Sequence, residues 1–463
     1  MNKGWPGTTR RQWRDLGGEK RTSSSRLAAD VPGAPVFRAY TDNHIEKLAA
    51  RARFSVDERL AMRAVAAVLP FRTNTYVVDE LIDWMAVPDD PIFRLTFPQG
   101  DMLAPADLSR MVDLFRRGAS RQELQLAAHE IRSQLNPHPG GQVDLNVPRH
   151  DGAELVGMQH KYAETLLFFP RHGQTCHAYC TYCFRWPQFV GEPKLKMASN
   201  DTGGLLAYLL HHPEITDVLI TGGDPLVMST AVLERYIEVL LDPRLAGLES
   251  IRLGTKAVSY WPYRFVTDPD ADDLMRLFDR IVAAGKHLAV MGHFSHPREL
   301  ELTIAATAVQ RIRSTGAVIR CQAPLIRRVN DDPSTWATLW RTATRMGAIP
   351  YYMFVERDTG PKDYFAVPLA RGYEIFHDAY KQVSGLARTV RGPIMSAQPG
   401  KVCVDGVADI CGEQVFVLHF VQARNAELVN QPFFARFDPT ATWLTDLVPA
   451  LGATRFPYEP ALS

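Results

Sequence analysis

Residues 166–186, LLFFPRHGQTCHAYCTYCFRW, join an apolar run to a loop that carries three closely spaced cysteines. Three and two residues separate Cys176, Cys180 and Cys183, so their thiolates can converge on one metal centre. Three thiolates are one ligand short of a closed zinc site or a fully ligated 4Fe-4S cluster. An iron without a protein ligand can bind a substrate or cofactor, which suits a cluster used for chemistry. A zinc site completed by His177 or a distant residue, and chance clustering, are the alternatives.

From this loop onward the chain alternates short apolar runs with helical stretches. Several helices end at a glycine just before the next run, as at Gly285, Gly316 and Gly347, where a left-handed residue turns the chain back. This repetition predicts a parallel α/β sheet, open or curled into a barrel. Functional groups should lie in the loops after the C-terminal ends of the strands. The six predicted strands are 166–169, 218–220, 251–253, 288–291, 318–322 and 351–355.

The sequence divides into four predicted segments. Residues 1–35 are rich in Arg and Lys among Gly, Ser and Thr, and we expect a mobile basic tail, with an organelle transit peptide as the alternative. A helical pattern covers 36–150, where Ser55 with Glu58 and Ser120 with Glu123 make capping boxes. The sheet and its helices occupy 151–375. Residues 376–463 form a C-terminal extension with a β run at 415–420.

Composition excludes several classes of protein. The chain has 463 residues, 46% hydrophobic and 22% charged, as is typical of a globular protein. Lys and Arg number 52 against 51 Asp and Glu, so bulk charge gives no reason to expect binding to nucleic acid or an anionic membrane. We find no apolar run of about 18 residues and no signal-peptide pattern, and we expect a cytoplasmic protein. Six cysteines are too few for a disulfide scaffold.

The CxxxCxxC loop after a first strand, with Tyr182 before the third cysteine, resembles the radical S-adenosylmethionine (SAM) superfamily. The resemblance implies that Cys176, Cys180 and Cys183 hold a 4Fe-4S cluster, whose open iron chelates SAM. Tyr182 is then expected to pack near SAM. The implied fold is α/β, a radical SAM partial (β/α)6 barrel with an N-terminal helical domain and a C-terminal α+β extension.

The second predicted strand ends in Gly222, Gly223 and Asp224, which is similar to the superfamily's glycine-rich segment. The resemblance implies that this segment contacts the SAM amino group through backbone carbonyls. A Gly-Gly turn after a strand is weak evidence alone, and its place at the next strand end after the cysteines strengthens it.

Segments between about residues 60 and 425 resemble one branch of that superfamily, the lysine 2,3-aminomutases, which add pyridoxal 5′-phosphate (PLP) to SAM. The resemblance implies that Arg185 grips the substrate α-carboxylate, a task for which a planar guanidinium is suited. His293 and Gln322 match positions beside SAM and PLP, although a buried structural histidine explains His293 equally well. Lys401 matches the lysine that forms the PLP Schiff base. The similar segments are 69–72, 157–162, 180–185, 218–225, 252–255, 293–297, 322–331, 350–352 and 399–401.

The sequence departs from the family at three places. Gln398-Pro399-Gly400 replaces a longer glycine run before Lys401, so an ordinary turn lysine is an alternative there. Arg357 aligns with one of two aspartates that read the ammonium of lysine, and no acid stands at the other. A guanidinium repels an ammonium and attracts a carboxylate, so Arg357 is the predicted reader of an acidic or uncharged side chain. Glu356 and Asp358 flank Arg357, and a shift of one residue restores a site for a basic substrate.

The C-terminal region also lacks the clustered cysteines that bind structural zinc in some family members. We expect Cys403 and Cys411 to be buried structural thiols, and we expect no zinc.

The predicted function is a radical SAM, PLP-dependent 2,3-aminomutase, an isomerase that converts an α-amino acid to its β-amino acid. Arginine or lysine 2,3-aminomutase, another reaction on the same scaffold, and a non-enzymatic metal-binding protein are the alternatives. The resemblance implies an electron donor such as flavodoxin or ferredoxin, and a homo-oligomer.

Overall fold

The computed structural model describes residues 35–191 and 195–459. The predicted tail at residues 1–35 lies outside these residues, apart from Pro35. No helix in the described part of the chain is both long and apolar enough to cross a membrane.

The first part of the described chain is mainly helical. Both predicted capping boxes are present: Ser55 accepts a hydrogen bond from the Glu58 backbone N–H (3.2 Å), and the Glu58 carboxylate accepts one from the Ser55 N–H (2.7 Å). Ser120 and Glu123 make the same reciprocal pair. These bonds satisfy N–H groups that the start of a helix leaves without partners. The elements are β1 (Ala39–Thr41), α1 (Ile45–Ala49), α2 (Val56–Val68), β2 (Arg72–Asn74), α3 (Pro91–Thr96), α4 (Pro105–Arg116) and α5 (Arg121–Gln134).

After a short β3–β4 pair (Arg149–His150 and Ala153–Glu154), the chain forms an eleven-stranded sheet in which each strand pairs with the next one along the sequence. Strands β6 to β12 are parallel, and β5 and β13 to β15 pair antiparallel. Because β6 pairs with β5 and β12 with β13, the parallel strands do not close on each other. The sheet is therefore the predicted partial barrel, open on one side. Its strands are β5 (Met158–Tyr162), β6 (Thr165–Phe168), β7 (Asp217–Ile220), β8 (Ser250–Thr255), β9 (His287–His293), β10 (Val318–Leu325), β11 (Ile349–Val355), β12 (Arg391–Ser396), β13 (Gly400–Ile410), β14 (Glu413–Ala423) and β15 (Pro432–Arg436).

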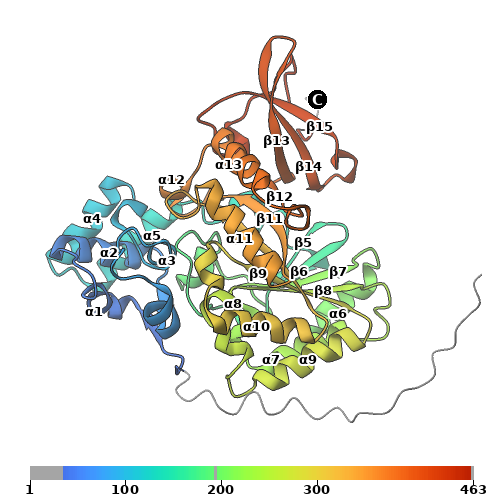
Figure 1. Cartoon of the computed structure of the whole chain (residues 1–463), viewed down its shortest axis with the longest axis horizontal. Helices are drawn as coiled ribbons and strands as arrows, with labels where there is room; N and C mark the ends of the chain where they lie inside the picture. Colours follow the sequence, from blue (N-terminus) through green and yellow to red (C-terminus); the bar gives the residue numbers. More distant parts are fainter. Residues whose placement is uncertain (1–34, 192–194, 460–463) are drawn as a thin grey trace, which may run out of the picture. The chain divides into compact units, whose positions relative to one another are not determined.

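Helices follow the parallel strands and pack on the outer face of the sheet, while β13 to β15 extend it beyond β12 (Figure 1). The chain turns from helix to strand with positive φ at Gly285 (81°), Gly316 (85°) and Gly347 (78°), as predicted. The helices are α6 (Thr202–His211), α7 (Thr230–Leu240), α8 (Ala257–Tyr260), α9 (Ala271–Ala283), α10 (Thr303–Ser314), α11 (Pro333–Arg345), α12 (Lys362–Phe365) and α13 (Leu369–Lys381).

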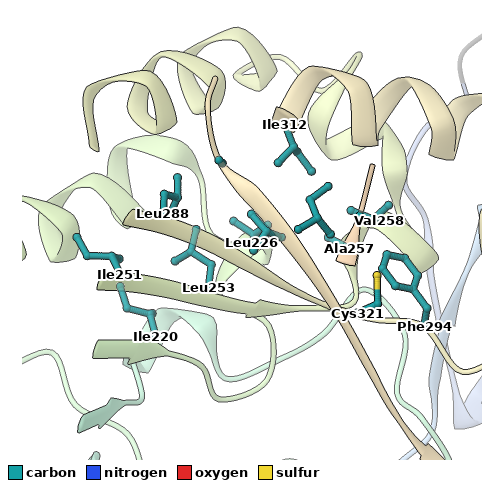
Figure 2. Close-up of a cluster of buried hydrophobic side chains, with 14 of the residues drawn as sticks. Ile220, Leu226, Ile251, Leu253, Ala257, Val258, Leu288, Phe294, Ile312 and Cys321 are labelled. Carbon is teal, nitrogen blue, oxygen red and sulfur yellow. The ribbon is translucent and has the colours of Figure 1, made fainter. Parts of the chain in front are cut away.

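The main hydrophobic core lies between the strands and these helices. Figure 2 shows side chains from neighbouring strands, including Ile220, Leu253 and Cys321, gathered on the side where Ile312 of α10 projects. Every second residue of β8 is buried in this way, so Arg252 and Gly254 lie on the other face of the sheet. The outer face therefore stabilises the fold, and the inner face is left for polar side chains.

The structure differs from the sequence predictions in three details. β12 is a further parallel strand that the predicted set of six lacks, and the predicted boundary at residue 375 falls inside α13. Cys403 is buried, as expected, but Cys411 is exposed, so the prediction of a buried Cys411 is wrong. Cys411 lies in the tight turn between β13 and β14 with a φ of 52°, where the side chain has no core to enter.

Candidate functional site

The cysteine loop follows β6 and is anchored by backbone hydrogen bonds to the N-terminal helical part. The Tyr179 N–H donates to the Arg72 carbonyl (2.8 Å), and the Thr181 N–H donates to the Leu95 carbonyl (2.9 Å). Cys176, Cys180 and Cys183 are all free thiols. Leu95 and Arg72 thus fix a loop whose own sequence forms no regular element.

A different cation lies near each of the three thiols. Burial raises the pKa of Cys176, Cys180 and Cys183, and that of Cys183 reaches about 12. Arg72 opposes this rise at Cys176, Lys256 opposes it at Cys180, and Arg185 opposes it at Cys183. Each thiol also has an acid nearby that raises its pKa further: Asp224 at Cys176, Glu299 at Cys180 and Glu356 at Cys183. The loop thus places both a cation and an acid beside every cysteine.

The three loop cysteines are not a compact set of ligands in this structure. Within the described residues, the one set of three ligand side chains whose atoms all lie within 4.8 Å of one another is Cys403, Asp405 and His419, on another part of the sheet. A 4Fe-4S cluster binds each thiolate through a separate iron, so it does not require the three sulfurs to meet at one ion.

Lys256, Glu299 and Tyr260 surround the position of Cys180 and were missed by the sequence reasoning. Lys256 Nζ lies 2.5 Å from a carboxylate oxygen of the fully buried Glu299, and the Tyr260 hydroxyl lies 3.7 Å from Cys180 Sγ. The resemblance ended at Thr255, one residue before Lys256. The one available signal was the position of Lys256 directly after the end of β8.

The Gly222–Asp224 segment passes very close to the backbone of the cysteine loop. A Cβ on Gly223 would lie 2.3 Å from the Thr175 carbonyl oxygen, so only glycine fits there. The Asp224 N–H donates to that same carbonyl (2.7 Å). Within the described residues, neither the Gly222 nor the Gly223 carbonyl accepts a hydrogen bond, so both are available to a ligand amino group.

The Asp224 side chain is fully engaged with the protein itself. Its carboxylate accepts hydrogen bonds from the Thr255 hydroxyl (2.8 Å to each oxygen), the Lys256 N–H (2.9 Å) and the Leu226 N–H (2.9 Å). The carboxylate therefore ties the end of β7 to the end of β8.

Three further predicted residues meet at the ends of neighbouring strands. The Tyr182 hydroxyl lies 3.2 Å from His293 Nδ1 and 2.8 Å from the Ser295 hydroxyl, and the two rings stack with centroids 6.0 Å apart. Gln322 of β10 pairs with His293 of β9. Burial and the charge of Lys256 lower the pKa of His293 to about 3, so its imidazole is neutral. Tyr182, His293 and Gln322 thus lie together beside the cysteine loop.

Arg185 is buried, and no acidic side chain among the described residues forms an ion pair with it. Its guanidinium carbon lies 3.9 Å from the centroid of Phe169 and 5.5 Å from that of Phe184. Burial lowers the pKa of Arg185 to about 9, and its Nη1 has no hydrogen-bond partner. A buried guanidinium with an unused donor is costly, and this donor is therefore available to an anionic ligand.

Arg357 approaches the same aromatic ring from another segment. Its guanidinium carbon lies 4.9 Å from the Phe184 centroid, and its Nε is also buried without a partner. Arg357 Nη2 donates to the Pro139 carbonyl (3.3 Å). The structure thus brings Arg185 and Arg357 to one ring, although 172 positions separate them in the sequence.

The two acids that flank Arg357 differ in whether they have a hydrogen-bond partner. The Asp358 carboxylate accepts a hydrogen bond from Asn136 Nδ2 (3.3 Å), which draws it toward the end of α5. Glu356 is buried, and burial raises its pKa well above the usual range. No hydrogen bond or ion pair involves the Glu356 carboxyl within the described part of the chain; the charge of Arg357 opposes the rise of its pKa, and the carboxyl lies near Cys183.

Lys401 is the second residue of β13. Its amine donates to the side-chain carbonyl of Gln422 (2.6 Å) and lies 5.4 Å and 5.1 Å from the ring centroids of Tyr162 and Tyr352. Burial, with Arg252 and Arg391 nearby, lowers the pKa of Lys401 to about 7. A large fraction of this amine is therefore neutral near pH 7, as a nucleophilic amine requires.

Lys161 is a second amine in this region, and the sequence reasoning missed it. It donates to the Ala397 carbonyl, and burial together with Arg357, Arg424 and Lys401 lowers its pKa to about 7. The adjacent Tyr162 hydroxyl is buried without a partner. Lys161 carried no sequence signal because its neighbours lie more than 190 positions further along the chain.

A cavity of about 580 Å³ borders the cysteine loop. Val156, Arg171, Gln174, Tyr179, Gln188 and Phe189 are among its lining residues, and none of the predicted site residues lines it. The polar groups described above therefore lie away from this cavity, and we place the candidate site where those groups converge.

Comparison with known proteins gives relatives, one of which matches most of the chain. No family model matches the chain. A putative L-lysine 2,3-aminomutase of Aquifex aeolicus (strain VF5) is 31% identical over 392 residues, which cover 84% of this chain and 91% of that protein. The chain belongs to the lysine 2,3-aminomutase family. The resemblance stated from the sequence is thus confirmed.

More distant relatives of this lysine 2,3-aminomutase family member match about half of the chain. The L-lysine 2,3-aminomutase of Bacillus subtilis (strain 168) is 27% identical over 247 residues, 53% of this chain and 49% of that protein. Among solved structures, a radical SAM methyltransferase from Sphaerobacter thermophilus has a TM-score of 0.35 and 14% identity, and the match covers 63% of this chain and 94% of that chain.

Proposed function

We propose that this family member is a radical SAM aminomutase that uses PLP to convert an α-amino acid to its β-amino acid. The observation that supports this most is Lys401, a partly buried amine with a lowered pKa. It stands on the same continuous sheet as the loop with three free cysteines.

Cys176, Cys180 and Cys183 are the proposed ligands of a 4Fe-4S cluster, and they fit it because three free thiols share one loop and each has a cation nearby. The free carbonyls of Gly222 and Gly223 fit the SAM amino group. When bound, cluster and SAM supply a carbon-centred radical that abstracts hydrogen from the substrate. An electron donor such as flavodoxin or ferredoxin is part of this proposal.

Lys401 is the proposed anchor of PLP. A neutral lysine amine can bind the PLP aldehyde covalently and later give it up to the amino group of a substrate. The rings of Tyr162 and Tyr352 offer flat surfaces beside this amine. Lys161 and the unpartnered Tyr162 hydroxyl add an amine and a hydroxyl that can donate hydrogen bonds to a phosphate. When bound, PLP supplies a conjugated ring that carries the migrating amino group.

Arg185 is the proposed reader of the α-carboxylate, and Arg357 that of the side chain. Both guanidinium groups have buried, unused N–H donors and share Phe184, so one amino acid with two carboxylates can satisfy both. A substrate ammonium at Arg357 would instead meet the like charge of the Arg357 guanidinium. Glutamate and aspartate are therefore the first proposed substrates, ahead of uncharged amino acids.

A basic substrate is the second candidate, and Glu356 favours it. This buried carboxyl has no partner within the described residues and lies near Cys183. An arginine or lysine side chain that reached Glu356 would remove the cost of burying it alone. The two candidates thus assign the side-chain contact to adjacent residues, Arg357 or Glu356.

The test is anaerobic reconstitution with iron, sulfide and PLP, followed by incubation with SAM, a reductant and each common amino acid. Mass spectrometry then measures 5′-deoxyadenosine and β-amino acids. We expect a β-product from glutamate or aspartate. Arg357→Ala should raise the KM about 10-fold or more, because a charge-assisted hydrogen bond contributes about 1.5–3 kcal/mol. Arg345→Ala, which changes an exposed arginine of α11, should leave the KM unchanged.

Other results would change the assignment. Activity on arginine or lysine alone, lost in Glu356→Gln and kept in Arg357→Ala, would select the second candidate. Cleavage of SAM without any β-amino acid would indicate a different reaction on this scaffold. A protein that holds only zinc and never cleaves SAM would refute the radical mechanism.

A further inference from the structure

A cysteine, an aspartate and a histidine meet on the C-terminal β-hairpin, on the strand that carries Lys401. Cys403 and Asp405 belong to β13, and His419, the cross-strand partner of Cys403, belongs to β14. One ligand atom of each residue lies within 4.8 Å of one atom of both others, and His419 Nδ1 is 2.5 Å from Asp405 Oδ2. Two paired strands thus hold three ligand-type side chains in a fixed arrangement.

The cluster has a closed side and an open side. Cys403 is only 6% exposed and packs with Tyr352 and Ile394. The side chain of His419 is 25% exposed and that of Asp405 is 38% exposed. A metal ion bound here would keep one side accessible to water, which leaves room for a fourth ligand.

The donor set selects the class of metal. A thiolate, an imidazole and a carboxylate all bind Zn²⁺, whereas Ca²⁺ and Mg²⁺ require oxygen ligands. A role for Cys403 as a nucleophile explains the cluster poorly, because the Asp405 carboxylate disfavours a thiolate beside it. In a catalytic cysteine–histidine pair, the histidine would contact the thiol directly as its base. Here Asp405 links Cys403 to His419 instead.

We propose that Cys403, Asp405 and His419 form a zinc-class metal site that ties β13 to β14 beside the PLP lysine. On binding, Cys403 releases its proton to solvent, neutral His419 supplies a nitrogen, and the thiolate and carboxylate charges balance the divalent ion. Water supplies the fourth ligand. The site is separate from the three-cysteine loop, and it differs from the zinc-free expectation because that expectation considered cysteines alone.

The purpose of the metal site depends on the proposed role of Lys401 as the PLP lysine. Lys401 stands two positions before Cys403, and the β13–β14 ladder has an irregularity between Lys401 and Val402. A metal bridge directly after this irregularity would hold the strand in register where the ladder itself is interrupted. Metal binding itself can be measured without any activity, so its failure is distinguishable from failure of the aminomutase proposal.

The experiment uses Co²⁺ as a spectroscopic probe in the full chain with Cys176, Cys180 and Cys183 changed to alanine, which removes the competing thiols. We expect one equivalent of Co²⁺ to give a thiolate-to-cobalt charge-transfer band, which excess Zn²⁺ abolishes. Cys403→Ser should remove the band, and His419→Ala should weaken binding about 100-fold or more, beyond the usual effect of a residue that only orients a ligand. Cys411→Ser, a cysteine on the same hairpin, is the matched control and should keep the band.

A second measurement keeps the proposal testable if the triple alanine variant does not fold. Metal analysis of the anaerobically reconstituted parent should find one zinc per chain in addition to cluster iron. That zinc should be absent from Cys403→Ser and present in Cys411→Ser. Absence of a cobalt band in the folded triple variant, a band that survives Cys403→Ser, or equal zinc in both serine variants would overturn the proposal.

Discussion

Removal of the Asp224 carboxylate separates its structural role from a direct role in binding SAM. Asp224→Ala leaves three donors without an acceptor: the Thr255 hydroxyl and the N–H groups of Lys256 and Leu226. Burial raises the pKa of Asp224, so part of the hydrogen-bond energy offsets the cost of burying the charge. We therefore take the low end, about 1 kcal/mol for each donor, and expect a loss of roughly 3 kcal/mol.

The assay is the thermal midpoint, Tm, of the metal-free protein, followed by circular dichroism. An unfolding entropy of about 2.1 cal/mol/K per residue gives about 1 kcal/mol/K for the 463 residues of the chain, so the expected fall in Tm is about 3 °C. Asp224→Asn keeps one acceptor and should lower Tm by about half as much. Asp113→Ala, on the exposed side of α4, should change Tm by less than about 0.5 °C.

An unchanged Tm in Asp224→Ala, together with SAM binding weakened about 10-fold or more, would refute this reasoning. That result would mean that the carboxylate is not needed between β7 and β8 and contacts SAM directly. A fall in Tm with only a small loss of SAM affinity in Asp224→Asn is the expected outcome.

Three further predictions concern the metal loop, the lysine and the carboxylate reader. Cys176→Ala should lower the iron bound after reconstitution, measured by colorimetric assay, whereas Cys321→Ala in the outer core should leave it unchanged. The amount of PLP that borohydride traps on Lys401 should decline as the pH falls through about 7, because the protonated amine cannot attack the aldehyde. An amount of trapped PLP that stays constant down to pH 5 would contradict the lowered pKa of Lys401. Arg185→Lys should raise the substrate KM about 10-fold or more, since an ammonium cannot replace the paired donors of a guanidinium, and an unchanged KM would place the α-carboxylate elsewhere.

The parallel part of the fold was predictable because its signals are local. Each of the six predicted strands is an apolar run, and the turns at Gly285 and Gly347 follow from helix ends that need a left-handed residue. β12 was missed because Gly392 and Pro393 interrupt its apolar pattern, and a proline normally argues against an inner strand. The ladder tolerates Pro393 because the β11–β12 register shifts at this point.

The cysteine loop was also predictable, since its three residues lie within one short segment. The surroundings of the loop were not, because they come from distant parts of the chain: Arg72 lies near Cys176 and Lys256 near Cys180. No local pattern connects residues that meet only when β8 and the N-terminal helices pack around the loop.

The charge of the proposed substrate pocket was predicted in part. Alignment with the family placed Arg357, but it left open which of Glu356, Arg357 and Asp358 faces the site. The structure draws Asp358 toward Asn136 and leaves Glu356 and Arg357 as the groups near the cysteine loop and Phe184. Lys161 was invisible to the sequence because the charges that lower its pKa reach it from other elements.

The continuous ladder from β6 to β13 has a consequence for protein engineering. A chimera of two family members that is joined between β12 and β13 must rebuild the pairing of Ile394 with Cys403 across the junction. The unit that can be exchanged is thus the whole sheet, and a new substrate preference must arise from replaced side chains on fixed strands. Transplanting the lysine-bearing hairpin alone should give an insoluble product, because both halves would expose unpaired strand edges.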